Sequence, residues 1–112
     1  MHEMALAEGI LDISLNEAKK NQATVIPENG LLVGKLSTVE PEALLFCFES
    51  IARGTIAETA ELKIQNVDLV GVCNKCGARI TLEHYSFLCP KCGGTLILES
   101  GRELQVEYID ME

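Results

Sequence analysis

Hydrophobic side chains recur along the first twenty residues at the spacing of an amphipathic helix. At about 100° per residue they cover about half of the helix circumference. The apolar positions are Leu6, Ala7, Ile10, Leu11, Ile13, Leu15 and Ala18, and the polar ones are Glu8, Asp12, Asn16 and Lys19. This pattern predicts a helix over 3–21 with one face buried.

Two strands and a second helix are predicted in the middle of the chain. Residues 27–30, Pro-Glu-Asn-Gly, are typical of a turn, and the apolar run after them predicts a strand over 31–36. Pro41 marks the start of a helix that ends at Gly54, because proline is tolerated in the first helical turn. Its predicted inward face is Leu44, Leu45, Phe48, Ile51 and Ala52. Alternating apolar residues then predict strands over 61–69 and 103–109.

The order of these elements indicates an α+β fold. Each helix and the sheet have one apolar side to bury, so two helices on one face of a three-stranded mixed sheet is the simplest packing. Four cysteines fall between the last two strands. We therefore expect one α/β domain over 1–69, completed by 99–112, with a small ribbon-like module of four cysteines inserted at 70–98.

Charge and composition argue against several classes of function. The chain of 112 residues is 47% hydrophobic, and 17 acidic against 9 basic residues give a formal net charge of −8. Nucleic-acid binding needs the opposite charge, because Lys and Arg contacts to phosphate supply most of the affinity. A membrane span needs an apolar run of about 18 residues or more, and a signal peptide needs a basic start; the sequence has neither. We expect a cytoplasmic protein without nucleic-acid or membrane partners.

Two Cys-x-x-Cys pairs predict a metal centre. The ligands are Cys73, Cys76, Cys89 and Cys92, and a glycine follows the second cysteine of each pair. Four thiolates complete a tetrahedral zinc site with no open position for substrate, so the zinc is structural. Mononuclear iron in the same sulfur cage is the main alternative, and His84, between the pairs, could replace one thiolate. A module of about 29 residues cannot build an adequate core, so its folding should depend on the metal.

The fifth cysteine raises the question of catalysis. Cys47 lies between Phe46 and Phe48 on the predicted second helix, where a free cysteine usually packs as a small apolar residue. A cysteine hydrolase would also need a paired histidine. We therefore expect no enzyme activity.

The N-terminal sequence Met1-His2-Glu3 is a candidate nickel site. The Met1 amine, the deprotonated His2 amide nitrogen and the His2 imidazole can close two chelate rings around one ion. Square-planar nitrogen donors favour Ni(II) or Cu(II), whereas zinc prefers a tetrahedron. The Glu3 amide nitrogen or an oxygen donor can fill the fourth position, and Glu40 is a candidate to accept the other ring N–H of His2.

Together these segments resemble the HypA/HybF family of hydrogenase maturation proteins, which are nickel metallochaperones. The resemblance is carried by residues 1–5, by 33–37 leading to Pro41 and Glu42, by Phe48 and Glu49, and by both cysteine pairs. It implies a nickel site at the N-terminal amine and His2, with Glu3 at or beside the ion, and structural zinc on the four cysteines. It also implies delivery of nickel to the large subunit of NiFe-hydrogenase with a HypB-type GTPase, and in some bacteria support of urease maturation proteins.

A second hypothesis is a zinc-ribbon adaptor that binds nucleic acid or a protein assembly. Lys75, Arg79 and Lys91 give the module a small basic excess, which the zinc-thiolate charge of about −2 cancels. Retention on heparin at low salt would favour the adaptor. The sequence leaves open whether the protein is a monomer or a homodimer.

Overall fold

The computed structural model describes residues 2–82 and 86–112, and the chain divides into two compact units. Unit 1 comprises Met1–Leu32, Thr38–Gln65 and Gln105–Glu112, and unit 2 comprises Val33–Ser37 and Asn66–Leu104. The elements in chain order are α1 (Glu3–Lys20), β1 (Glu28–Gly34), α2 (Pro41–Ala52), β2 (Glu61–Val67), β3 (Val70–Cys73), β4 (Arg79–Thr81), β5 (Leu96–Ser100) and β6 (Leu104–Asp110).

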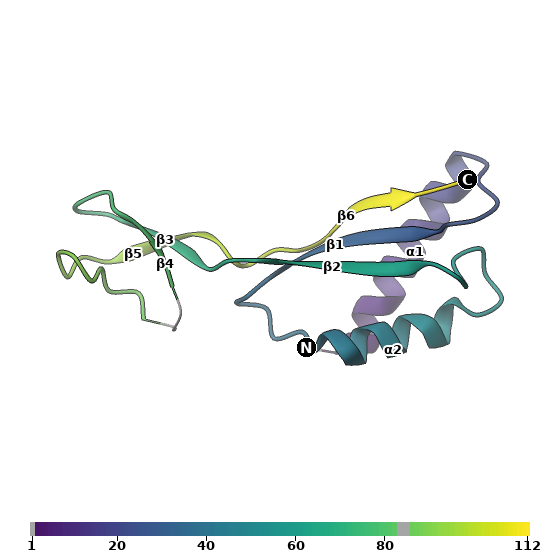
Figure 1. Cartoon of the computed structure of the whole chain (residues 1–112), viewed down its shortest axis with the longest axis horizontal. Coiled ribbons are helices and arrows are strands. Elements are labelled where there is room, and N and C mark those ends of the chain that lie inside the picture. The colour runs from purple at the N-terminus through teal and green to yellow at the C-terminus, as the bar shows by residue number, and fades with distance from the viewer. Residues whose placement is uncertain (1, 83–85) are drawn as a thin grey trace. The chain divides into compact units, whose positions relative to one another are not determined.

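Unit 1 is built on a three-stranded sheet with the order β2-β1-β6. The Glu61 N–H donates to the Pro27 carbonyl, so β1 and β2 begin side by side and run parallel. Val25, before the start of β1, and Glu112, after the end of β6, exchange hydrogen bonds, so β1 and β6 run antiparallel. The sheet is therefore mixed. Both helices lie on the same side of it and pack against each other (Figure 1). The predicted fold class is confirmed.

The predicted turn at 27–30 is wrong, because Asn29 and Gly30 lie inside β1. Asn29 is fully buried, and its side-chain amide donates to Ser14 Oγ of α1 at 2.6 Å. Ser14 in turn donates to the Ile10 carbonyl at 2.7 Å. Gly30 leaves the space that the ring of Tyr108 occupies. Tertiary contacts of these two residues thus override their usual preference for turns.

The helix faces differ from the prediction at two positions. Ile13 of α1 is 48% exposed and Leu45 of α2 is 36% exposed, although both were expected to face inward. Buried Ser14 takes the place beside the sheet that the hydrophobic pattern assigned to Ile13. On α2 the buried stripe is Leu44, Phe48 and Ala52, a strict four-residue spacing that leaves Leu45 at its edge.

Unit 2 holds a second three-stranded sheet with the order β4-β3-β5, in which β3 pairs antiparallel with both neighbours. Gly71 of β3 lies so close to Leu96 of β5 that a side chain there would meet its Cβ at 2.9 Å. One buried core cluster of this unit consists of Cys73, Cys89 and Leu96, with Ala78, Ile80 and Leu82 packed against it. Val33 and Leu69 are also buried in this unit. Two metal ligands therefore belong to the small buried cluster beside the cysteine turns.

Unit 2 also takes in residues beyond the predicted module at 70–98. The Lys35 N–H donates to the Val67 carbonyl at 3.0 Å, and the Leu36 N–H donates to the Gly101 carbonyl at 2.8 Å. Lys35 also forms an ion pair with Asp68 at 2.9 Å. These contacts tie residues 33–37 into unit 2. The predicted domain boundaries stay a prediction.

Candidate metal sites

The two cysteine pairs lie on turns with the same backbone hydrogen bonds. At the first pair the Gly77 N–H donates to the Cys73 carbonyl at 3.1 Å. At the second pair the Gly93 N–H donates to the Cys89 carbonyl at 2.8 Å. Gly77 and Gly93 have φ values of 73° and 77°, a conformation that glycine adopts without strain. The glycine after each pair thus closes a turn that aims two sulfurs to one side.

The four turn cysteines form one cluster. The ligand atoms of Cys73, Cys76, Cys89 and Cys92 all lie within 4.8 Å of one another. Cys73 Sγ is 3.4 Å from Cys92 Sγ, and Cys76 Sγ is 3.8 Å from Cys89 Sγ. A tetrahedron with zinc–sulfur bonds of about 2.3 Å has sulfurs about 3.8 Å apart. The donor set and its spacing therefore fit a single tetrahedral metal ion with no vacant position.

The electrostatics of the cluster disfavour four thiolates together when no cation is bound. The N–H groups of Cys76 and Lys75 point at Cys73 Sγ, at 3.5 and 3.4 Å, and lower the pKa of this thiol to about 6. For Cys92 the Gly94 N–H lowers the pKa, but Cys73, burial and the other two cysteines together raise it to about 11. The protein thus favours the thiolate form of Cys73 and disfavours that of Cys92. A divalent cation bound to the sulfurs would supply the positive charge that stabilises all four thiolates.

Gly94 belongs to this centre, although the cysteine spacing alone gives it no role. A Cβ at Gly94 would lie 2.9 Å from Cys73 Sγ and 3.3 Å from Cys92 Sγ. Two ligand sulfurs would have to move to make room. The paired glycines at 93 and 94 are the only signal in the sequence that points to this close approach.

Replacing Gly94 by alanine is expected to weaken the metal centre without removing a ligand. Displacing groups around metal ligands typically lowers affinity by about 10- to 100-fold, and we expect a loss of at least about tenfold. A chelator competition assay measures it. Gly9→Ala is the matched control, because Gly9 lies in α1 with nothing within 4 Å of the added methyl. Equal metal affinity for Gly94→Ala and Gly9→Ala would contradict the predicted geometry.

The second predicted site lies where α1 and α2 begin. His2 is exposed and is the N-cap of α1, with extended backbone dihedrals, φ −87° and ψ 102°. Glu3 Oε2 accepts a hydrogen bond from the N–H of Glu40, the N-cap of α2, at 3.1 Å. This bond, then the backbone of Glu3 itself, lowers the pKa of the Glu3 carboxyl. Met1, the remaining predicted ligand, lies outside the described residues.

The sequence also offered Cys47 and His84 as candidate functional residues. Cys47 is half-buried on α2, in keeping with the near-core packing expected for it. His84, the alternative zinc ligand, lies outside the described residues, and the four sulfurs already complete a tetrahedral set.

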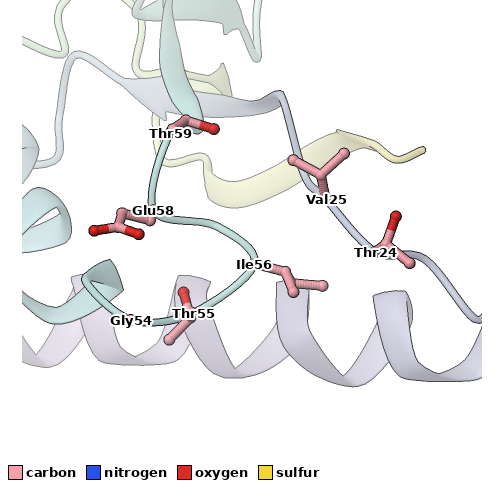
Figure 2. Close-up of a pocket in the computed structure, with 7 residues that line it drawn as sticks. All are labelled: Thr24, Val25, Gly54, Thr55, Ile56, Glu58 and Thr59. Atoms are coloured by element: carbon pink, nitrogen blue, oxygen red, sulfur yellow. The ribbon is translucent and has the colours of Figure 1, made fainter.

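A surface hollow in unit 1 lies at the opposite ends of the two helices. It is lined by Thr24, Val25, Gly54, Thr55, Ile56, Glu58 and Thr59 (Figure 2). These residues follow the C-terminal ends of α1 and α2, whereas His2 and Glu3 lie at the N-terminal end of α1, which is about 27 Å long. The hollow is therefore separate from the predicted nickel ligands.

Comparison with known proteins places the whole chain in one family. Residues 1–111 match the family model described as "Hydrogenase/urease nickel incorporation, metallochaperone, hypA". A hydrogenase maturation factor HypA from Prosthecochloris aestuarii is 40% identical over 113 residues, with 100% of both chains covered. One from Rhizobium leguminosarum bv. viciae is also 40% identical, with 100% of this chain and 98% of the relative covered. The chain belongs to the HypA family.

The fold agrees with this assignment. A solution structure described as the Ni metallochaperone HypA from Helicobacter pylori matches with a TM-score of 0.69, covering 99% of this chain and 97% of the other. At 23% sequence identity this likeness concerns the fold alone. The HypA family resemblance that the sequence motifs suggested is thereby confirmed. Within the described residues, neither helix is long and apolar enough to cross a membrane.

Proposed function

We propose that this HypA-family protein is a nickel carrier that binds Ni(II) at its N-terminus and hands it on for the maturation of NiFe-hydrogenase. A GTPase partner of the HypB type takes part in the delivery to the hydrogenase large subunit, in the cytoplasm. The observation that carries the proposal is the match of residues 1–111 to a nickel-incorporation family, together with Met1-His2-Glu3 at the N-terminus. The role needs no catalytic turnover.

The proposed nickel ligands are the Met1 amine, the His2 amide nitrogen and the His2 imidazole. These three nitrogens close adjacent chelate rings and suit a square-planar ion. The position of His2 as N-cap supports amide deprotonation, because the first N–H groups of a helix have no intrahelical acceptor. The His2 carbonyl, by contrast, accepts the first helical bond from the Leu6 N–H at 3.2 Å. Nickel can thus take the amide nitrogen without breaking α1.

Glu3 is proposed to supply or orient the fourth donor. A glutamate carboxyl is ionised at neutral pH, and the pKa of Glu3 is lowered further below its ordinary value. This charge offsets the positive N-terminal end of α1, which otherwise disfavours a cation. The bond to Glu40 restrains one carboxylate oxygen, Oε2, and leaves Oε1 for another ligand. The same bond brings the start of α2 beside the start of α1, which is the condition for the Glu40 carboxylate to accept the ring N–H of His2.

The ion proposed for the four-cysteine cluster is structural zinc. Sulfur-only coordination in a closed tetrahedron favours zinc, with mononuclear iron as the competitor. Cys73 and Cys89 are buried core residues of unit 2, so the metal would take the place of a larger hydrophobic core there.

Deletion of the gene is expected to reduce hydrogenase activity to background in nickel-limited medium. Excess nickel should restore part of it, because a carrier raises the rate of delivery and performs no chemistry on the ion. Hydrogenase assays with and without added nickel measure both effects, and urease assays test the second client of the family description. Normal hydrogenase activity in a deletion strain without another HypA-family protein would refute the proposed pathway.

A further inference from the structure

One side chain of α2 is exposed in a way that the fold does not explain. Phe46 is 69% exposed, the largest exposed fraction among the exposed large hydrophobic residues of the described chain. Leu44, Phe48 and Ala52 form the buried stripe of the same helix. At about 100° per residue, Phe46 lies about 160° from the middle of that stripe. Its ring therefore points away from the core of unit 1, so it contributes little to folding.

Carboxylates flank this phenylalanine. Glu42 lies one turn before Phe46 and Glu49 lies one turn after it, and both are exposed on the same side of α2. Leu45, 36% exposed, widens the apolar surface. We name the face formed by Glu42, Leu45, Phe46 and Glu49 the α2 outer face.

The charge of the whole unit decides what kind of partner this face fits. Unit 1 carries 13 acidic and 4 basic side chains, a formal net charge of −9, whereas unit 2 carries 4 acidic and 5 basic ones, a formal net charge of +1. A second copy docked face to face would bring Glu42 and Glu49 against their own counterparts. An apolar pocket rimmed by Lys and Arg would instead bury the ring and pair both carboxylates.

The α2 outer face also begins at the nickel-binding end of the protein. The bond from the Glu40 N–H to Glu3 Oε2 joins the residue before α2 to the first residue of α1. Glu42 and Phe46 follow within the first two turns of α2. A protein seated on this face would therefore lie beside Glu3, one of the proposed nickel ligands.

We propose that the α2 outer face is the docking surface for the GTPase partner, which would present a basic-rimmed apolar pocket to Phe46. This rests on the proposed function for the identity of the partner. Docking would anchor the complex through Phe46 and place the nickel ligands at the interface, and the carboxylates would speed association at low salt.

The test is calorimetric titration of the purified HypB-type GTPase with the full-length protein and its variants. Phe46→Ala is expected to raise Kd by at least about tenfold, the typical loss for a buried aromatic anchor. The double variant Glu42→Lys with Glu49→Lys should bind the GTPase more weakly than the unmodified protein at low salt, and its Kd should depend less on salt concentration. Ile13→Ala is the matched control, because Ile13 is an exposed apolar residue of α1 outside this face, and its Kd should stay within about twofold of the unmodified protein.

Circular dichroism, nickel binding and light scattering distinguish the possible outcomes. Phe46→Ala should retain its helical circular dichroism, since alanine is a good helix former at an exposed position, and should bind nickel as before. An unchanged Kd for Phe46→Ala, or a loss of affinity for the hydrogenase large subunit alone, would overturn the docking proposal and leave the proposed function standing. So would light scattering that shows Phe46→Ala splitting a dimer into monomers. Failure of the unmodified protein to bind the GTPase would overturn the docking proposal together with the part of the GTPase in the proposed function. Failure of the unmodified protein to bind nickel would instead refute the proposed function, whatever the Phe46 result.

Discussion

Replacing Cys89 by alanine is expected to empty the metal centre and unfold most of unit 2. Cys89 is a buried core residue as well as a ligand, and its sulfur lies 3.8 Å from Cys76 Sγ. Loss of one thiolate leaves an incomplete tetrahedron, and the free energy of metal binding is also the folding free energy of so small a module. The purified protein should contain about one zinc per chain, and the variant well under half of that. Metal analysis and amide NMR spectra measure the two effects.

Cys47→Ser is the matched control for the cysteine variant. Cys47 is half-buried in α2 of unit 1, away from the four-sulfur cluster in sequence, so its replacement should leave the zinc content unchanged. Unit 1 should keep its amide signals in Cys89→Ala, because its core of α1, α2 and the β2-β1-β6 sheet contains no metal ligand. A zinc-free protein whose signals from residues 70–98 match those of the purified protein would contradict the coupling of metal binding and folding.

His2→Ala is expected to abolish tight nickel binding while zinc stays bound. The change removes the imidazole and with it one of the two chelate rings. Loss of a residue that only supports a ligand costs about 10- to 100-fold in metal affinity, so loss of a ligand should cost more than about 100-fold. The zinc content should not change, because the two sites share no ligand. Isothermal titration with Ni(II), accompanied by zinc analysis of the same sample, measures both.

Glu3→Gln tests the supporting role of the carboxylate. Glutamine keeps an oxygen that can accept the Glu40 N–H, and its backbone nitrogen is unchanged, but the negative charge is gone. We therefore expect a smaller loss of nickel affinity than for His2→Ala. A Glu3→Gln variant that loses nickel as completely as His2→Ala would make the carboxylate, rather than the amide nitrogen, an obligatory ligand.

Local periodicity predicted most of the fold. The helix predicted over 3–21 corresponds to α1 at Glu3–Lys20, and the helix from Pro41 corresponds to α2 at Pro41–Ala52. The strand predicted over 31–36 begins earlier, at Glu28, because Asn29 is held by Ser14 and Gly30 accommodates Tyr108. Those partners are distant in sequence, so no local pattern could have revealed them.

The candidate sites likewise combine features that the local sequence determines with features that depend on tertiary contacts. The spacing of the cysteines predicted a cluster that the structure brings together, since each Cys-x-x-Cys-Gly segment determines its own turn. The bond between Glu3 and Glu40 joins residues 37 positions apart and depends on how α1 packs against α2. Exposure of Phe46 likewise depends on which stripe of α2 faces the sheet, and both helix stripes were predicted only approximately.

The central claim, nickel held by the N-terminal amine and His2, is tested most directly by titrating nickel into two forms of the protein. One form has the free Met1 amine, and the other carries a short extension ahead of Met1 that turns this amine into an amide. Calorimetry together with X-ray absorption spectroscopy reports affinity and coordination. We predict one tight, square-planar, nitrogen-rich nickel site in the first form and its loss in the second. Equal nickel affinity in the two forms would contradict the proposed site.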